Sequence, residues 1–119
     1  MAKVLEKVER RLGEKLFLKG DRCIGPKCAF TRRSYAPGLH GKRKRRGSSE
    51  YGELLRAKQR VRFVYGLDDR DIKKYTQEAE SKSGVFSSNF WHLLESRLDN
   101  AVFRLGFAPS RRNARRETI

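Results

Sequence analysis

The chain has 119 residues and a formal net charge of +15, from 29 basic and 14 acidic side chains. A field of this strength repels itself unless a polyanion neutralises it, so nucleic acid is the first candidate partner. The sequence has no apolar run near the ~20 residues that a membrane-spanning helix needs, and its start, MAKVLEKVERR, lacks the apolar block of a secretion signal, which predicts a small cytoplasmic protein outside the membrane.

The first predicted element is a short helix over residues 3–12, which Gly13 can end. The apolar residues at helical spacing in it are Val4, Leu5, Val8 and Leu12. From Cys23 to Gly47, prolines and glycines favour a long loop in place of any regular element. We expect this loop to become ordered only on RNA, which would supply the counter-charge it needs.

Positive charge is concentrated between residues 32 and 62, which hold 11 basic and 2 acidic side chains, whereas residues 63–103 hold 5 and 7. An evenly solvated surface would not place its charge in this way. We therefore interpret the run KRKRR at residues 42–46 and its surroundings as a phosphate-binding region. The alternative is a flexible solvated loop, which isolated charge runs usually form.

The next helix is predicted from Ser48 or Ser49 to Gly66. Either serine can cap its start, and Glu50 and Glu53 favour the helix dipole in the first turn. The residues expected on its buried face are Leu54, Ala57, Val61, Val64 and Tyr65. The cations expected opposite or beside that face are Arg56, Lys58, Arg60 and Arg62.

Two more helices are predicted after this one. The first runs from Asp68 or Asp69 to about Gly84, with Ile72, Tyr75 and Ala79 facing inward. The second runs from Ser87 or Ser88 to Gly106 and is the most apolar, so it is expected to be the central core helix. Its expected core face consists of Phe90, Trp91, Leu94, Leu98, Ala101, Val102 and Leu105. His92 lies off that face and is expected to be exposed.

A final helix is predicted after Pro109, with Ser110 as its cap and four arginines along it. A hydroxyl, guanidinium groups and free backbone amides at a helix start can all bind phosphate. The alternative is a short helix hairpin with solvated arginines. Because no stretch shows the alternation of a strand, the sequence predicts an all-α fold.

Three stretches, APGLHGKRKRR, EYGELLRAKQRVRFVYG and LLESRLDNAVFRLGFAPSRRNARR, together resemble the bacterial small-subunit ribosomal protein four family. The resemblance runs from about Gly13 to Arg116. It implies a helical, basic N-terminal domain at residues 1–88 with a long basic loop, followed at residues 89–119 by the first helices of an αL-type RNA-binding module. Family members continue beyond the position of Arg116 through a small sheet, whereas this sequence stops at Ile119.

The resemblance also implies a function. It is that of a structural constituent of the small ribosomal subunit, which grips a multi-helix junction in the 5′ domain of the ribosomal RNA and helps to nucleate assembly. Other implied features are proximity to the sister protein five and to the side where messenger RNA enters, a contribution to translational accuracy, and regulation of the protein's own messenger.

Some relatives bind zinc through a C-x2-C pair followed by a C-x4-C pair. Cys23 and Cys28 match the second pair, but the positions of the first pair hold Glu6 and Glu9. A structural zinc normally takes four cysteine or histidine ligands. We therefore expect Cys23 and Cys28 to be free thiols and the protein to have no cofactor. The alternative is a zinc site with both cysteine and carboxylate ligands. The spacing of His40 does not indicate that it is a ligand of such a site.

The candidate RNA-binding residues are basic side chains, two tyrosines and the serine expected to cap the last helix. They are Arg32, Arg33, His40, Lys42, Arg43, Lys44, Arg45, Arg46, Tyr51, Arg56, Lys58, Arg60, Arg62, Tyr65, Arg97, Arg104, Ser110, Arg111, Arg112 and Arg115. Arg97 has an equally good structural role, since Asp99 lies two residues away. No phosphate-cradling glycine motif and no nucleophile with a matching base point to an enzyme. Two rival functions are a zinc-dependent protein-interaction module and a general nucleic-acid-compacting protein.

Overall fold

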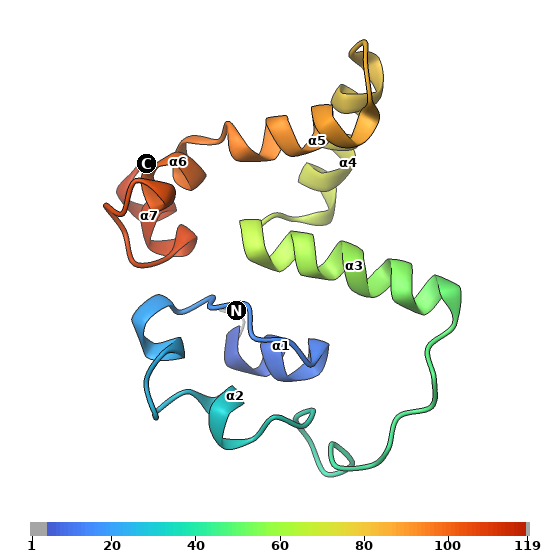
Figure 1. Ribbon diagram of the computed structural model, residues 1–119, viewed down its shortest axis with the longest axis vertical. Helices are drawn as coiled ribbons and strands as arrows, with labels where there is room; N and C mark the ends of the chain where they lie inside the picture. Colours follow the sequence, from blue (N-terminus) through green and yellow to red (C-terminus); the bar gives the residue numbers. More distant parts are fainter. Residues whose placement is uncertain (1–4, 119) are drawn as a thin grey trace. The chain divides into compact units, whose positions relative to one another are not determined.

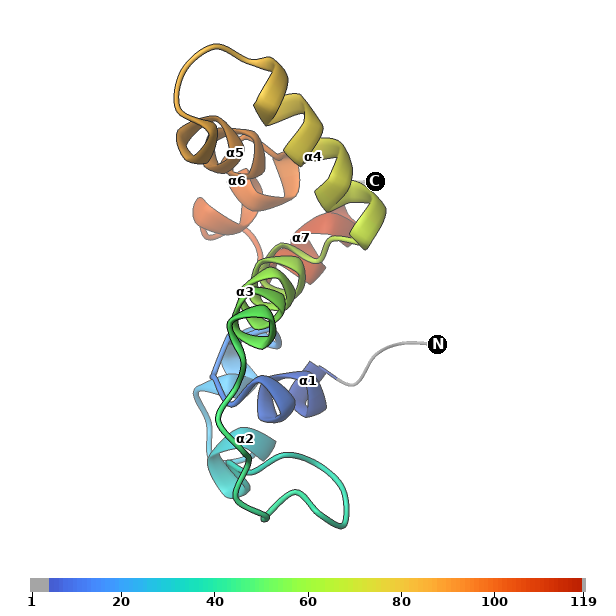
Figure 2. The same cartoon turned by 90° about the vertical axis from the view of Figure 1, so that its right-hand side faces the viewer.

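The computed structural model describes residues 5–118, and every regular element within that range is a helix, which confirms the predicted all-α fold. In chain order (Figures 1 and 2) the elements are α1 (Leu5–Leu12), the 3-10 turn η1 (Gly20–Cys23), α2 (Ala29–Arg32), α3 (Glu50–Tyr65), α4 (Asp69–Ser81), α5 (Phe86–Glu95), α6 (Leu98–Arg104) and α7 (Arg111–Glu117). In the part of the chain described, no helix has both the length and the apolar character needed to cross a bilayer.

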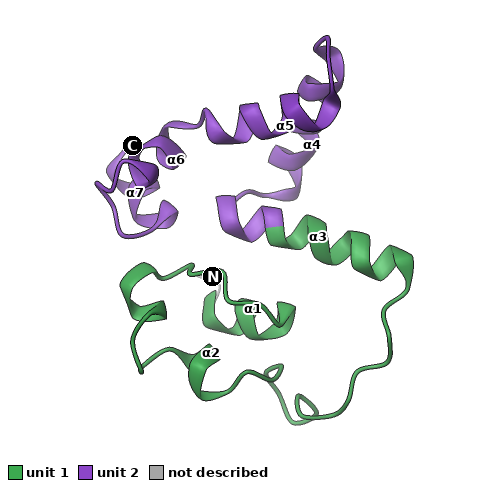
Figure 3. Cartoon of the chain, in the orientation of Figure 1, with its two compact units in different colours: residues 1–60 green, residues 61–119 purple. Residues whose placement is uncertain are grey.

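The chain forms two compact units, and the division falls within α3 (Figure 3). Unit 1 spans Met1–Arg60 and unit 2 spans Val61–Ile119. The domain boundary expected at residues 88 and 89 concerns the family's domain organisation and stays a prediction.

Unit 1 contains α1 packed against α2. The helix predicted at residues 3–12 is confirmed from Leu5 onward, while Val4 lies outside the described residues. The buried residues of α1 are the acidic Glu6 and Glu9. Unit 1 therefore buries two acids beside the apolar Leu18, Cys23 and Cys28.

The predicted loop of unit 1 contains more structure than expected. Cys28 has extended backbone dihedrals and precedes the four-residue helix α2, and its carbonyl accepts a hydrogen bond from the Arg32 amide at 3.2 Å. The prediction of no regular element from Cys23 to Gly47 was therefore wrong at α2, because this local turn satisfies its own backbone groups. From Arg33 to Ser49 the chain has no helix, as predicted.

Unit 2 has the apolar core. Tyr65, Leu67, Ile72 and Leu94 are buried together, and Leu94 is fully enclosed. The partly buried residues packed on this cluster are Val61, Val64, Tyr75 and Phe90. The core lies where α4 and α5 pack against each other and where α3 ends (Figure 1).

The helix predicted from Ser87 or Ser88 to Gly106 is two helices, α5 and α6. The chain breaks at Arg97, whose ψ of 139° is extended. Two polar contacts hold the break: the Ser96 hydroxyl donates to the His92 carbonyl at 2.6 Å, and the Asn100 side-chain amide donates to the Glu95 carbonyl at 3.1 Å. The Asn100 side chain thus satisfies a carbonyl that a continuous helix would have paired with the Asp99 amide, whereas the His92 carbonyl also keeps its helical bond from the Ser96 amide at 3.0 Å.

This break changes which side chains are buried. The single core face predicted for residues 87–106 was wrong, because Trp91, Leu98 and Leu105 are 46%, 64% and 71% exposed. The predicted buried face of α3 is confirmed only in its last turns, since Leu54 is 65% exposed and Ala57 is also exposed. The exposure predicted for His92 is confirmed.

Candidate nucleic-acid interface

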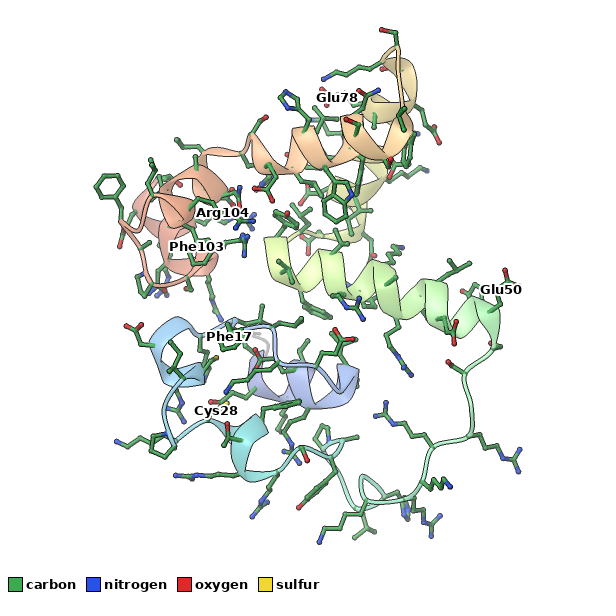
Figure 4. All side chains as sticks on the ribbon, in the orientation of Figure 1. Phe17, Cys28, Glu50, Glu78, Phe103 and Arg104 are labelled. Carbon is green, nitrogen blue, oxygen red and sulfur yellow. The ribbon has the colours of Figure 1, made fainter. Side chains whose placement is uncertain are left out.

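The run Lys42–Arg46 lies on an irregular, helix-free stretch of unit 1 and is exposed throughout. Nitrogen-tipped side chains point away from this part of the ribbon (Figure 4). Lys42 lies 5.2 Å from the centre of the Tyr35 ring, and Arg45 donates to the Arg11 carbonyl at 3.0 Å. The side chains of Arg43, Lys44 and Arg46 make no hydrogen bond or ion pair with any residue that the structure describes. The run is thus anchored at two points and otherwise open.

Helix α3 carries its predicted cations in different environments. Arg56 is exposed, whereas Arg60 forms an ion pair with Glu14. Arg62 is tied down more firmly, because it forms an ion pair with Asp69 at 3.3 Å and donates to the Leu67 carbonyl at 3.3 Å. Arg62 therefore closes the turn between α3 and α4.

Arg97 lies at the break between α5 and α6 and faces inward. Its guanidinium donates to both oxygens of Asp99 at 3.1 Å and to the Tyr75 hydroxyl at 2.6 Å. Burial opposes the charge on Asp99, but the hydrogen bonds and charges of Arg97 and Arg115 outweigh it and lower the pKa of Asp99. Asp99 is thus an ionised, buried carboxylate that joins α6 to α4.

Arg115 on α7 completes this buried group. It forms an ion pair with Asp99 at 3.0 Å and donates to the carbonyls of Gly66 and Tyr65 at 2.6 and 3.3 Å. Those two carbonyls belong to the end of α3, which has no helical partner for them. Arg115 therefore neutralises Asp99 and caps α3 at the same time.

A second polar cluster surrounds Glu95. Its carboxylate accepts hydrogen bonds from the Tyr65 hydroxyl, from the Asn100 amide at 2.7 Å and from Arg104 at 3.3 Å. Burial, followed by the hydrogen bond to Glu95, raises the pKa of Tyr65 to about 12, and the same hydrogen bond lowers the pKa of Glu95. Arg111 donates to Asn100 at 2.9 Å, so this cluster joins the end of α3 to α5, α6 and α7.

Arg111 also lies against two aromatic rings. Its guanidinium carbon is 5.0 Å from the Tyr65 ring centre and 4.5 Å from that of Phe103. Phe103 and its neighbour Arg104 are labelled on α6 in Figure 4. Ser110 is buried and caps α7, where its hydroxyl accepts a hydrogen bond from the Asn113 amide at 3.2 Å.

The structure divides the predicted RNA-binding residues into two sets. The exposed set consists of Arg32, Arg33, His40, Lys42, Arg43, Lys44, Arg45, Arg46, Tyr51, Arg56, Lys58 and Arg112. The internally bonded set consists of Arg60, Arg62, Tyr65, Arg97, Arg104, Ser110, Arg111 and Arg115. The first set has its side chains in solvent, although Arg32 and Arg45 each donate one hydrogen bond to a backbone carbonyl; in the second set Arg60 and Arg104 remain partly exposed. Arg116 on α7 is also exposed and belongs with the first set.

Glu9, Cys23 and Cys28 form a buried cluster in unit 1, with ligand atoms that all lie within 4.8 Å of one another. One oxygen of Glu9 is bonded, whereas Oε2 is buried without any hydrogen-bond partner. Two thiols and a spare carboxylate oxygen are ligands that zinc accepts. The donor set therefore supplies three of the four ligands that a structural zinc ion normally takes. Cys28 is labelled in Figure 4.

The other two candidates lie outside this cluster. Glu6 forms ion pairs with Arg22 at 2.9 Å and Lys19 at 3.8 Å. His40 is exposed and has no place in the group of ligand atoms. From the sequence, Glu6 and Glu9 are equally good candidate metal ligands. The tertiary structure places only Glu9 beside the two cysteines.

Phe17 is a feature that the sequence analysis missed. It is the one non-glycine residue with positive φ in the described chain, at 56°, and it is 53% exposed. This conformation costs a non-glycine residue ~1–2 kcal/mol, and the amino group of Lys15, 5.3 Å from the ring centre, recovers at most ~0.5–1 kcal/mol at an exposed site. Hydrogen bonds to Glu9 offset the remaining conformational cost. Its Oε1 accepts hydrogen bonds from the amides of Leu16 and Leu18, and bonds to a charged group contribute ~1.5–3 kcal/mol each.

Comparison with known proteins identifies the family of this helical, basic chain. Residues 5–95 match the family described as "Ribosomal protein S4/S9 N-terminal domain". The chain belongs to this family, as its resemblance predicted.

Individual relatives are similar over most of this chain. It is 55% identical over 106 residues to the small ribosomal subunit protein uS4 of Thermus thermophilus, and 53% and 54% identical over the same length to those of Syntrophomonas wolfei and Syntrophus aciditrophicus. Each alignment covers 89% of this chain and 51% of the relative. The chain therefore spans about half the length of the curated relatives it matches.

Proposed function

We propose that this protein is a structural, non-enzymatic constituent of the small ribosomal subunit that binds its ribosomal RNA in the cytoplasm. The observation that carries the proposal is the exposed run Lys42–Arg46, of which three side chains have no partner among the described residues. Counter-ions released from RNA phosphates by such cations are a main source of binding free energy. The names of the uS4 relatives support the choice of the small subunit.

In this proposal the exposed cations position the protein through phosphates. A-form RNA hides its base edges in a deep groove, so specificity comes from the shape of the folded RNA. A multi-helix junction brings several phosphate backbones close together. Such a junction in the 5′ domain suits a protein whose cations lie on an irregular segment, and binding there early would help to nucleate assembly of the subunit.

The finer features proposed for the site follow from the family. They are contact with neighbouring small-subunit proteins, notably protein five, closeness to messenger RNA where it enters the subunit, and a contribution to translational accuracy. The exposed apolar residues Leu98, Leu105 and Phe107 of unit 2 are available for such protein contacts.

A binding comparison tests the main proposal. Affinities are measured at one potassium chloride concentration for a ribosomal RNA fragment with the 5′-domain junction, an unrelated RNA of equal length and duplex DNA. We expect the junction RNA to bind at least about tenfold more tightly than the other two. Equal affinity for all three would favour a nucleic-acid-compacting protein and would overturn the specific claim.

We also propose that Glu9, Cys23 and Cys28 hold a zinc ion. The specific observation in favour is the buried Oε2 of Glu9, which has no hydrogen-bond partner among residues 5–118. An unpaired buried carboxylate oxygen is costly unless a cation meets it. Zinc bound there would supply a structural link between α1, η1 and α2. Free thiols are the alternative, and a zinc-dependent protein-interaction module would bind acidic proteins in place of RNA.

A further inference from the structure

The loop after α1 is built around one carboxylate oxygen. Oε1 of Glu9 accepts hydrogen bonds from the amides of Leu16 at 3.2 Å and Leu18 at 3.0 Å. Two amides on either side of one residue converge on a single anion only when the backbone between them curves back, as in the amide nests that bind anions elsewhere. The residue between them, Phe17, accordingly has a φ of 56°.

Neither the backbone nor the core of unit 1 accounts for an aromatic residue at this position. A glycine adopts positive φ without strain, so the loop geometry alone would favour one. The next residue, Leu18, turns inward and is 9% exposed, whereas the ring of Phe17 is about half exposed. Figure 4 labels Phe17 on the loop that follows α1. The buried carboxylate of Glu9 thus holds the backbone on both sides of Phe17, whose ring is about half exposed.

The surroundings of the ring are cationic. Lys15 lies over it at 5.3 Å, and Lys19 and Arg22, two and five residues further on, remain partly exposed while pairing with Glu6. An aromatic side chain among lysines and arginines suits single-stranded nucleic acid, because the cations meet the backbone while the ring stacks on a base. Glu6 supplies one negative charge to Lys19 and Arg22, so together with Lys15 these surroundings keep a net positive charge, which a polyanion neutralises and an apolar protein partner would not.

We propose that Phe17 is a stacking residue for an unpaired base of the RNA, presented in its fixed conformation by the Glu9 carboxylate. This inference rests on the proposed RNA-binding function. Pre-organisation favours it, because the ring loses little conformational freedom on binding when its backbone is already held. One oxygen of Glu9 serves this role, and the other is the oxygen assigned to zinc.

Stacking and phosphate binding respond differently to salt, which gives the test. Affinity for the junction RNA is measured over a series of potassium chloride concentrations for the wild type, Phe17→Leu, Phe17→Tyr and the double variant Arg43→Gln, Lys44→Gln. We expect Phe17→Leu to bind about 5- to 100-fold more weakly at every concentration with an unchanged salt slope. Phe17→Tyr keeps a stacking ring and should bind like the wild type, while the double variant should lower the slope by about 2.

A second measurement separates stacking from a folding effect. Unpaired nucleotides of the RNA are replaced one at a time by abasic ones, and the loss caused by Phe17→Leu should disappear for one of them, as expected for two groups in contact. Equal binding by Phe17→Leu and the wild type, or a loss that persists with every abasic RNA, would overturn the inference. If the wild type shows no preference for the junction RNA, the proposed function fails instead. If Phe17 contacts a protein in place of the RNA, the wild type, Phe17→Leu and Phe17→Tyr should bind the RNA with equal affinity, which would also overturn the inference.

Discussion

The carboxylate of Asp99 accepts two parallel hydrogen bonds from Arg97, Nε to Oδ1 and NH2 to Oδ2, both at 3.1 Å. This paired geometry is the strongest that a guanidinium and a carboxylate can form. Arg115 approaches the same carboxylate at 3.0 Å. One buried negative charge thus holds two arginines from different elements, whose side chains are 20% and 39% exposed.

This arrangement predicts a large effect of removing the charge. Asp99→Asn should lower the free energy of unfolding by about 3 kcal/mol, because it leaves two partly buried guanidinium groups without a counter-charge. Urea unfolding followed by Trp91 fluorescence measures it. Glu78→Gln is the matched control, since Glu78 pairs with Lys82 on the surface and should contribute less than ~0.5 kcal/mol. An effect of Asp99→Asn as small as that of the control would contradict the prediction.

The raised pKa of Tyr65 predicts that the folded chain loses stability at alkaline pH. Its pKa is raised to about 12 in the folded chain, above the ordinary value of 10. Below pH 10 the phenol is protonated in both states, so its stabilisation is complete; between pH 10 and 12 only the unfolded chain releases the proton, and stability falls. The advantage of the wild type over Tyr65→Phe should shrink by about 2 kcal/mol across this range.

The measurement is denaturant unfolding of both proteins at several pH values. Tyr51→Phe serves as the control for the loss of a surface hydroxyl, because Tyr51 is 75% exposed. A difference between the wild type and Tyr65→Phe that stays constant from pH 10 to 12 would contradict the raised pKa of Tyr65.

Two arginines of α7 allow binding and folding to be separated. Arg112 is exposed, whereas Arg115 is bonded to Asp99 and to the end of α3. Arg112→Gln should reduce the salt slope of RNA binding by about 1 and leave the melting temperature unchanged. Arg115→Gln should lower the melting temperature by several degrees, as a loss of ~1–2 kcal/mol implies for a chain of this size. The reverse pattern would reject this division of the arginines.

The zinc proposal predicts one zinc ion per chain in protein purified without chelators. Cys23→Ser and Cys28→Ser should each abolish stoichiometric binding, and Glu9→Gln should weaken it. Glu6→Gln is the matched control and should keep its zinc, because Glu6 pairs with Arg22 outside the cluster. Metal content and the absorption of a cobalt-substituted sample, which reports thiolate ligands, provide the readout. Metal-free protein in which both thiols react freely with a thiol reagent would exclude the site.

The sequence by itself determined where α3 and α4 begin and end, and where the charge is placed. The caps and stops around α3 and α4 depend on short stretches of chain, so Ser49, Asp68 and Gly66 could be read locally. The cluster of cations between residues 32 and 62 is likewise a property of composition. Both were predicted because local hydrogen bonding and net charge need no knowledge of distant residues.

Only the tertiary structure decided which polar groups are buried and paired. Arg112 and Arg115 look alike in sequence, yet Arg115 reaches a carbonyl 49 residues away. The break at Arg97 was not predicted because the apolar spacing from Phe90 to Leu105 continues through it, while Arg97 and the neighbouring Asp99 bond to Tyr75 and Arg115 from other helices. Glu9 was equally ambiguous, since its burial comes from the loop that folds over it. Long-range pairing of charges is set by chain topology, and spacing along the chain cannot report it.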